Sequence, residues 1–267
     1  MYKLGINFEN VLSVAKELNL TVPETLNKLK LIGVSALDAE YSRVSGENSY
    51  LNDIVASRME LKCVYYMADF AGASSVISEM KVVDFCEKYG VKNVMFLTEP
   101  NVNVGGNEKT LKHNLRKIVN YARNFKISVS IENFGLETSW FSSVEKIKDL
   151  VKSVKNLTLT FDTGNFLLAG IDPNFAYDEL KFYVSRVHLK NRSYAPAVGA
   201  VPSVDINGND SYTTAIFSGS ANLEEFIKKV IGDYKVIDFI LEYNFADTRV
   251  FGEIEQSAVD FYTVTNE

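Results

Sequence analysis

Short apolar runs recur along the chain, separated by longer segments in which apolar residues follow a helical spacing. Each run contains enough apolar residues to be buried on both faces, as the strands of a parallel sheet are. Eight such runs occur, near residues 3–7, 33–40, 61–70, 91–100, 127–134, 157–166, 183–191 and 235–244. Eight strands alternating with helices is the number found in a closed α/β barrel.

The segments between the runs predict amphipathic helices, because their apolar residues lie three and four positions apart. The clearest are residues 23–32, 74–90, 107–125, 142–154 and 222–231. Local signals agree with this assignment. Pro23 and Pro173 suit the first turn of a helix, Gly90 suits a helix end, and Asn222 with Glu225 predicts a capping box.

One connection departs from this alternation. After the seventh run, a segment at about residues 192–220 is rich in Gly, Ser, Ala, Asn and Pro. A long irregular loop at the carboxyl edge of a barrel often covers a substrate, so we expect a lid, with a plain surface excursion as the alternative. The length of 267 residues suits one barrel domain. We therefore predict an α/β fold, a single-domain (β/α)8 TIM barrel over residues 1–267 that includes this loop.

In four runs the strand-like part ends in a residue able to bind a metal ion: SVSIE at Glu132, LTLTFD at Asp162, VSRVH at His188 and DFILE at Glu242. The carboxyl ends of parallel strands meet at one edge of the sheet, so these side chains are expected to converge. Three carboxylates and one imidazole suit Mn²⁺, Mg²⁺, Co²⁺, Fe²⁺ or Zn²⁺, whereas the lack of a thiolate argues against a structural zinc site.

Each of these residues also has a purely structural explanation. A carboxylate at a strand end can cap a helix or pair with Lys190, Arg192 or Arg249, and a lone strand histidine can be a satisfied core residue. Convergence of four such residues from successive strands favours the metal site. Such a site would polarise a sugar carbonyl, while Glu132 and Glu242 transfer protons on either side of it.

Other polar positions are candidate substrate contacts. Asn7 and Glu40 end the first two runs and face the same rim, with ordinary strand-end hydrogen bonding as the alternative. The turn Ser218-Gly219-Ser220 precedes a helix and could bind phosphate through backbone amides, but this signal is weak. A common capping arrangement explains the same residues without a ligand and is favoured.

Composition narrows the class of protein. The formal net charge of −6 gives no electrostatic reason to bind nucleic acid or an anionic membrane. The amino terminus has no apolar signal segment and no run reaches the length of a membrane span, so a cytoplasmic location is expected. Cys63 and Cys86 are predicted to be buried thiols, and His113 to be solvated.

The segments SIENFG, FDTGNFLLAGIDP, RVHLKN and FILEYN resemble the xylose isomerase-like barrel superfamily of sugar and sugar-phosphate isomerases and epimerases. The resemblance covers nearly the whole chain. It implies that the four candidate ligands, Glu132, Asp162, His188 and Glu242, bind one divalent ion, with Mn²⁺ the expected metal. It also implies that Glu132 and Glu242 are the acid/base pair. Arg192 resembles the basic residue that some relatives use to hold a substrate oxygen, with a surface arginine as the alternative. The expected substrate contacts are Asn7, Glu40, Asn165, Lys190 and Arg192.

The chain departs from this family at two positions. Many epimerases of the family have a histidine three residues after the aspartate, where this chain has Asn165. Many members read HLKD where this chain reads HLKN, so Asn191 replaces a carboxylate. Both changes bear on which substrate fits the site.

Three other activities remain open. An inosose-type dehydratase would use the same metal and proton transfer, and a non-catalytic barrel would only bind sugar. An abasic-site DNA endonuclease is disfavoured, because such relatives use many histidines and this acidic chain has two. The expected partner is therefore a small-molecule sugar or sugar phosphate, with no nucleic acid and no membrane, and a homo-oligomer is possible.

Overall fold

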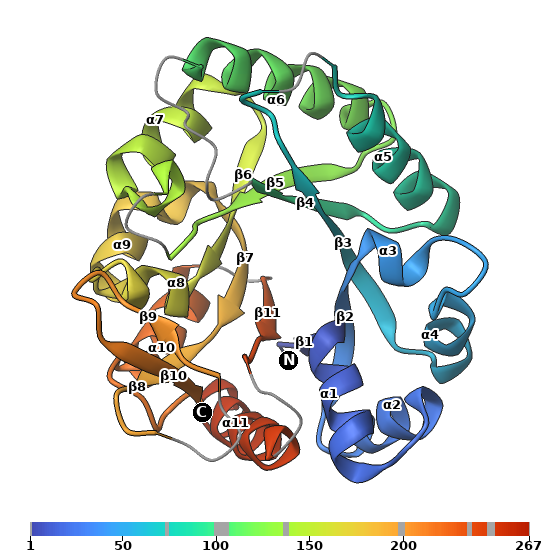
Figure 1. Ribbon diagram of the computed structural model, residues 1–267, viewed down its shortest axis with the longest axis vertical. Helices are drawn as coiled ribbons and strands as arrows, with labels where there is room; N and C mark the ends of the chain where they lie inside the picture. The colour runs from blue at the N-terminus through green and yellow to red at the C-terminus, as the bar shows by residue number, and fades with distance from the viewer. Residues whose placement is uncertain are drawn as a thin grey trace.

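The computed structural model describes residues 2–72, 75–98, 107–135, 139–196, 201–233, 237–244 and 249–266. Eight parallel strands close into a barrel in the order β1-β11-β7-β6-β5-β4-β3-β2 (Figure 1). They are β1 Leu4–Asn7, β2 Val34–Glu40, β3 Glu60–Ala68, β4 Asn93–Thr98, β5 Ser128–Glu132, β6 Leu157–Asp162, β7 Val184–Leu189 and β11 Asp238–Leu241. The predicted (β/α)8 barrel is confirmed.

Helices surround the strands on the outside of the barrel (Figure 1). They are α1 Phe8–Leu18, α2 Val22–Leu31, α3 Tyr41–Val44, α4 Leu51–Ser57, α5 Ile77–Tyr89, α6 Glu108–Arg123, α7 Val144–Ser153, α8 Thr163–Leu168, α9 Pro173–Leu180, α10 Leu223–Asp233 and α11 Val250–Thr265. Short 3-10 turns lie at Trp140–Ser142 and Lys181–Tyr183. In the described ranges, none of these helices has both the length and the apolar composition that crossing a bilayer requires.

The local helix signals work as expected. Pro23 and Pro173 lie in the first turns of α2 and α9, and Gly90 ends α5 with a φ of 74°, a conformation that favours glycine. The Glu225 amide donates to Asn222 Oδ1 at 3.2 Å at the start of α10. These caps fix where the chain turns between helix and strand.

The sixth strand covers the first part of its apolar run. It ends at Asp162, and residues from Thr163 onward form α8. The Asn165 amide donates to Asp162 Oδ1 at 2.7 Å, so the last residue of the strand is also the N-cap of the next helix. The strand end expected at Asp162 is therefore confirmed, and the rest of the run, to residue 166, belongs to α8.

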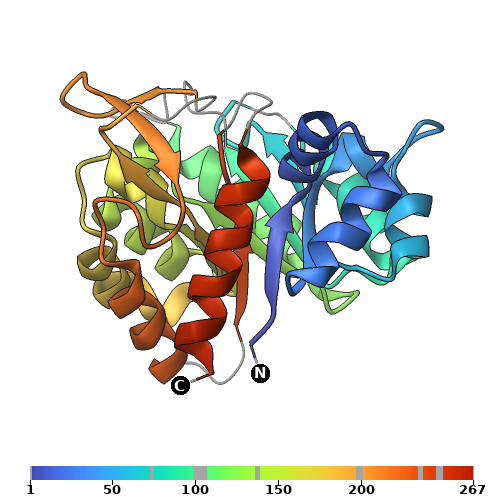
Figure 2. The same cartoon turned by 90° about the horizontal axis from the view of Figure 1, so that it is seen from below.

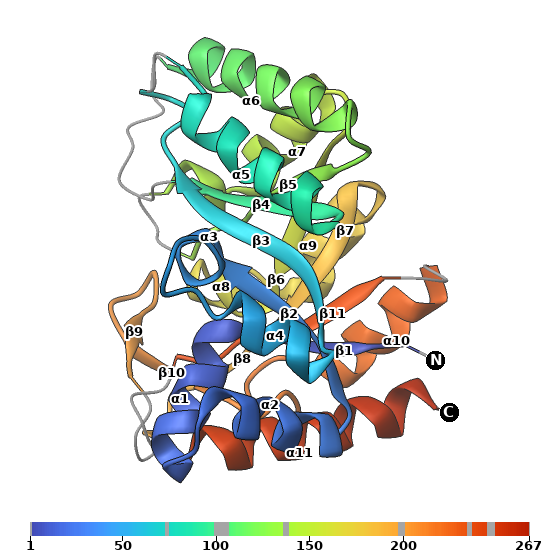
Figure 3. The same cartoon turned by 90° about the vertical axis from the view of Figure 1, so that its right-hand side faces the viewer.

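The segment predicted as an irregular loop is partly ordered into a small sheet. Its strands are β8 Asn191–Ser193, β9 Ser203–Val204 and β10 Asp210–Thr214, joined antiparallel in the order β8-β10-β9. The small sheet lies at the end of the barrel opposite the two termini (Figures 2 and 3). That end is the carboxyl end of the parallel strands, so the sheet flanks the rim on which the candidate ligands lie.

Candidate metal centre and active site

The four predicted ligands come together at the carboxyl end of the barrel. Glu132 ends β5, Asp162 ends β6, His188 lies in β7 and Glu242 directly follows β11, and these strands are neighbours in the barrel. One ligand atom from each residue lies within 4.8 Å of all the others. Asp162 and His188 are fully buried, and Glu132 is 6% exposed. Strand order thus produces the convergence that the sequence pattern predicted.

The ligand atoms are crowded in a way that fits a cation. His188 Nδ1 lies 2.7 Å from Glu132 Oε1 and 2.8 Å from Glu242 Oε2, and one ring nitrogen cannot donate well to both. Within the described ranges, the buried Glu132 Oε1 and Asp162 Oδ2 have no well-aligned hydrogen bond, only close charge contacts. Unpaired buried acceptors are costly, and a divalent metal would satisfy both atoms.

Burial and neighbouring charges separate the proton affinities of the two glutamates in the metal-free protein. Burial raises the pKa of Glu132 to about 7, with His188 opposing the rise. Burial also raises the pKa of Glu242, but Lys190 and His188 outweigh it and hold this pKa well below its ordinary value. For His188, burial lowers the pKa, yet contacts with Glu132, Asp38 and Glu242 raise it well above normal. The cluster therefore holds protons where a metal would bind.

Lys190 lies among the ligands. Its Nζ is 3.0 Å from Asp162 Oδ2 and 3.0 Å from Glu242 Oε1. Burial lowers its pKa, but these two carboxylates raise it above the usual value. The Lys190 side chain packs directly against Gly164, where a Cβ would lie 2.6 Å from Lys190 Cγ, so a larger residue at position 164 would clash with it. Lys190 is thus a buried cation bridging two candidate metal ligands.

Arg192 is buried beside this site. Its Nε donates to the Gly164 carbonyl at 3.0 Å and its Nη1 to the Ser211 carbonyl at 3.5 Å. Burial lowers its pKa, which the charges of Asp162 and Glu242 oppose. No carboxylate in the described part of the chain forms an ion pair with this guanidinium, whose charge is therefore available for an anionic group.

Two of the three other predicted substrate contacts, Asn7 and Asn165, have local hydrogen-bond partners. Asn7 Oδ1 accepts hydrogen bonds from the Glu9 amide at 3.1 Å and the Tyr65 hydroxyl at 3.2 Å. Asn165 Nδ2 donates to the Asn133 carbonyl at 3.0 Å. Glu40 occupies the N-cap position of α3 without a side-chain cap bond. Substrate binding by these three residues stays a prediction.

Asn191 has a clear structural role that an aspartate could not fill. Its Nδ2 donates to the carbonyls of Ile216 and Ala221 at 2.7 and 2.9 Å, and its Oδ1 accepts from the amides of Arg192 and Ala221. It thereby closes the turn before α10. The Ser220 amide in this turn donates to the Arg192 carbonyl at 2.7 Å, which favours the capping alternative over a phosphate site there.

Sequence reasoning missed a second set of polar residues inside the barrel. Asp38 in β2 and Arg186 in β7 are 0% and 2% exposed, and Asp38 Oδ2 lies 3.2 Å from His188 Nε2. Arg186 and His188 lie two positions apart in one strand and so share a face. A lone arginine within an apolar run was the available signal, because a buried cation needs carboxylate partners.

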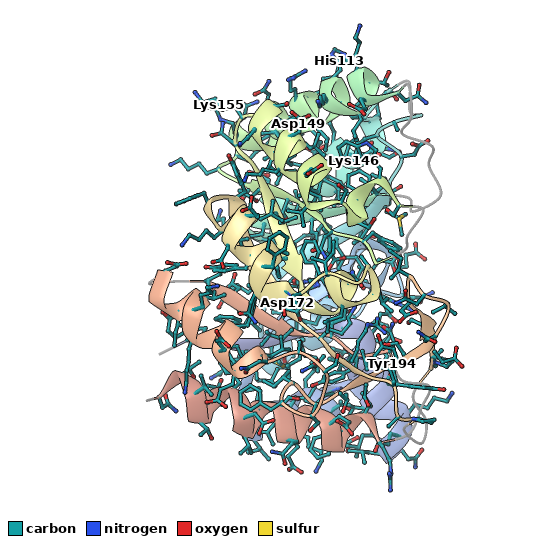
Figure 4. The ribbon with its side chains drawn as sticks, turned by 90° about the vertical axis from the view of Figure 1, so that its left-hand side faces the viewer. His113, Lys146, Asp149, Lys155, Asp172 and Tyr194 are labelled. Atoms are coloured by element: carbon teal, nitrogen blue, oxygen red, sulfur yellow. The ribbon has the colours of Figure 1, made fainter. Side chains whose placement is uncertain are left out.

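The remaining predictions concern residues outside the site. His113 lies on the outer side of α6, whereas Tyr194 lies beside the small sheet (Figure 4). The imidazole of His113 is exposed, as expected. Cys63 and Cys86 are buried free thiols, which confirms that prediction. Burial raises the pKa of Cys86 to about 12.

Comparison with known proteins places the fold. Among solved structures, L-ribulose 3-epimerase is 12% identical with a TM-score of 0.72, covering 100% of this chain and 96% of that one. The probable 3-DHS dehydratase AsbF from Bacillus anthracis is 12% identical with a TM-score of 0.72, covering 100% and 99%. The IolI protein with a bound zinc atom is 14% identical with a TM-score of 0.70, covering 99% and 98%.

These identities are low, so the three structures establish a shared fold and nothing more. No curated protein matches the sequence. The model of the xylose isomerase-like TIM barrel family matches residues 71–258, which is more than half of the chain. The protein therefore belongs to the xylose isomerase-like TIM barrel family.

Proposed function

We propose that this protein is a divalent-metal-dependent isomerase or epimerase that acts on a sugar or sugar phosphate. The observation that carries the proposal is the convergence of Glu132, Asp162, His188 and Glu242 within 4.8 Å at the catalytic end of the barrel. Family membership and a fold shared with L-ribulose 3-epimerase support the same class of reaction.

The metal would be held by these four side chains, and it would polarise the carbonyl and neighbouring hydroxyl of a bound sugar. We expect Mn²⁺, although the donor set also suits Mg²⁺, Co²⁺, Fe²⁺ and Zn²⁺. A cytoplasmic location and a homo-oligomeric state are further predictions from the sequence.

Glu132 and Glu242 supply the proton transfers. They lie on neighbouring sides of His188 Nδ1, at 2.7 and 2.8 Å, so both carboxyl groups reach the same small volume. One removes the proton alpha to the carbonyl, and the other delivers a proton to the enediol, which gives the isomer or epimer. Lys190, 3.0 Å from Glu242, stabilises negative charge that develops on the substrate oxygens.

Arg192 is the residue expected to bind an anionic substituent of the substrate. In the part of the chain that the structure describes, its buried guanidinium donates hydrogen bonds to backbone carbonyls alone. A phosphate or carboxylate would pair with this charge through bidentate hydrogen bonds. Asn7, Glu40 and Asn165 are proposed to contact the substrate hydroxyls.

The test is a hydrogen-exchange assay in deuterated water. Untagged protein, loaded with Mn²⁺, is incubated with a panel of ketoses and ketose phosphates, and deuterium is measured at the carbon alpha to the carbonyl. Exchange is expected with at least one sugar. Loss of water from the product instead of exchange would identify the inosose-type dehydratase, and absence of both reactions throughout the panel would exclude the proposed chemistry.

Variants assign the acid/base pair. Glu132→Gln and Glu242→Gln are each expected to reduce turnover by roughly 10²-fold or more while circular dichroism stays native. Glu145→Gln, in the exposed first turn of α7, is the matched control and is expected to keep full activity. A Glu132 or Glu242 variant with full activity would remove that residue from the pair.

A further inference from the structure

A line of paired charges runs from the candidate metal centre into the barrel. His188 Nε2 lies 3.2 Å from Asp38 Oδ2, on the side of the ring away from the metal ligands. Arg186 Nη1 donates to both oxygens of Asp38, at 2.7 and 3.0 Å. Arg186 Nη2 then donates to Asp238 Oδ2 at 3.1 Å. Asp38 thus joins the imidazole to a buried guanidinium.

Donor and acceptor roles in this line are fixed by chemistry. A guanidinium can only donate hydrogen bonds, so both Asp38 oxygens act as acceptors toward Arg186. Among the described residues, the remaining hydrogen-bond partner of Asp38 is His188 Nε2, which must then carry the proton of that contact. With Nε2 protonated, Nδ1 is the nitrogen that offers a lone pair to a metal.

The position of Nδ1 agrees with this assignment. It is the nitrogen that lies beside Glu132 Oε1 and Glu242 Oε2, within the group of ligand atoms. Metal-binding histidines are commonly oriented by a carboxylate that accepts a hydrogen bond from the other ring nitrogen. Asp38 comes from β2, three strands from β7 around the barrel, and contacts the ring at the nitrogen that faces away from the metal ligands.

We propose that Asp38, held in place by Arg186, is a positioning residue that keeps His188 Nε2 protonated and aims Nδ1 at the metal. This proposal rests on the proposed metal site but not on any reaction with a sugar. Asp38 touches neither metal nor substrate in this arrangement. It acts through His188, and Arg186 acts through Asp38.

Zinc binding and imidazole NMR test the proposal together. The chain has two histidines, and His113 is exposed, so a ¹⁵N-histidine label gives one site signal and one internal reference. Untagged protein loaded with Zn²⁺ is expected to show His188 with Nδ1 bound to metal and a slowly exchanging proton on Nε2. Asp38→Asn is expected to weaken Zn²⁺ binding by about 10- to 100-fold and to speed exchange of the Nε2 proton.

Asp238→Asn is the matched control, because it removes a carboxylate from the same arginine without touching His188. It is expected to keep the His188 spectrum and to bind Zn²⁺ within about twofold of the wild-type protein. If Asp238→Asn weakened Zn²⁺ binding as much as Asp38→Asn does, the effect would be general destabilisation, and the positioning role would be disproved.

A second variant guards against misfolding of Asp38→Asn. The double change Asp38→Leu with Arg186→Met replaces the buried pair by apolar side chains, which folded proteins often tolerate. Weakened Zn²⁺ binding in this folded double variant supports the proposal, and wild-type affinity in it overturns the proposal. If the wild-type protein bound Zn²⁺ with this Asp38 dependence but converted no sugar, only the proposed reaction would fail.

Discussion

Two groups of buried charges lie one above the other in this barrel, and they differ in how well their atoms are paired. In the ligand cluster, Glu132 Oε1 and Asp162 Oδ2 lack aligned hydrogen bonds within the described chain. Below it, both oxygens of Asp38 accept from Arg186, which also donates to Asp238. The ligand cluster, here called the upper group, thus leaves carboxylate oxygens without a hydrogen-bond donor among the described residues. The lower group, Asp38, Arg186 and Asp238, contains the cation that pairs with its carboxylates.

The difference in pairing distinguishes residues that bind a ligand from residues that hold the ligand-binding side chains in place. Buried charges without partners are expensive, so a fold keeps them where a ligand restores the balance. Buried charges with full partners hold side chains in place. Asp38 belongs to the lower group by its bonds to Arg186 and reaches the upper group through His188. The contrast predicts that removing a cation will harm the lower group, and that adding one will stabilise the upper group.

The largest effect on stability is expected from Arg186→Met. The change removes the guanidinium that pairs with both oxygens of the fully buried Asp38 and, among the described residues, leaves His188 as its cationic partner. Breaking a buried ion pair from one side costs about 3–5 kcal/mol. Urea unfolding of the metal-free protein measures the free energy of unfolding.

The double variant with Asp38→Leu is the control for this result. It removes the carboxylate together with the guanidinium, and so is expected to recover much of the lost stability. A loss below about 1 kcal/mol in Arg186→Met alone would show that the lower pair is dispensable.

A smaller effect is expected from metal binding, and it depends on pH. Burial raises the folded-state pKa of Glu132 to about 7 from an ordinary 4.5. In the metal-free protein, the bound proton therefore adds stability below about pH 4.5, and this contribution is lost as the pH rises through about 7. Metal requires the deprotonated carboxylate, so metal binding has the opposite dependence on pH.

The measurement is the difference in Tm between Mn²⁺-loaded and chelator-treated protein at about pH 7.5 and about pH 5.5. We expect at least tenfold weaker binding at the lower pH, equivalent to about 1.4 kcal/mol less stabilisation at fixed metal concentration. Glu132→Gln, which cannot titrate, provides the comparison. An equal difference in Tm at both pH values in the wild-type protein would contradict the role of Glu132 as a titrating ligand.

The same contrast explains what the sequence could predict. The ligands were found because each follows an apolar run, and the fold carries the ends of parallel strands to one rim. Asp38 was missed because its partners lie far along the chain, Arg186 at 148 positions and His188 at 150 positions from it. Hydrogen bonds across a barrel interior depend on strand register and closure, which periodicity does not encode.

The segment after His188 was only partly predictable for a different reason. Its strands β8, β9 and β10 are three, two and five residues long, too short for a periodic pattern. Asn191 stabilises the segment through contacts with Ile216 and Ala221, 25 and 30 residues away. Composition showed where the alternation of strands and helices stops, but it did not indicate which strands would pair.

The smallest effect is expected at the exposed end of the lower line of charges. Asp238 Oδ1 lies 3.6 Å from Lys62, which pairs with Glu60 at 2.9 Å, and Glu60 pairs with Lys3 at 3.0 Å. The Lys3 side chain is 59% exposed, compared with 3% for Arg186, so water already solvates its charge. Lys3→Met is therefore expected to change the free energy of unfolding by less than about 1 kcal/mol. Urea unfolding of Lys3→Met and Arg186→Met in parallel tests this. An equal loss of unfolding free energy in the two variants would mean that the strength of these ion pairs does not depend on burial.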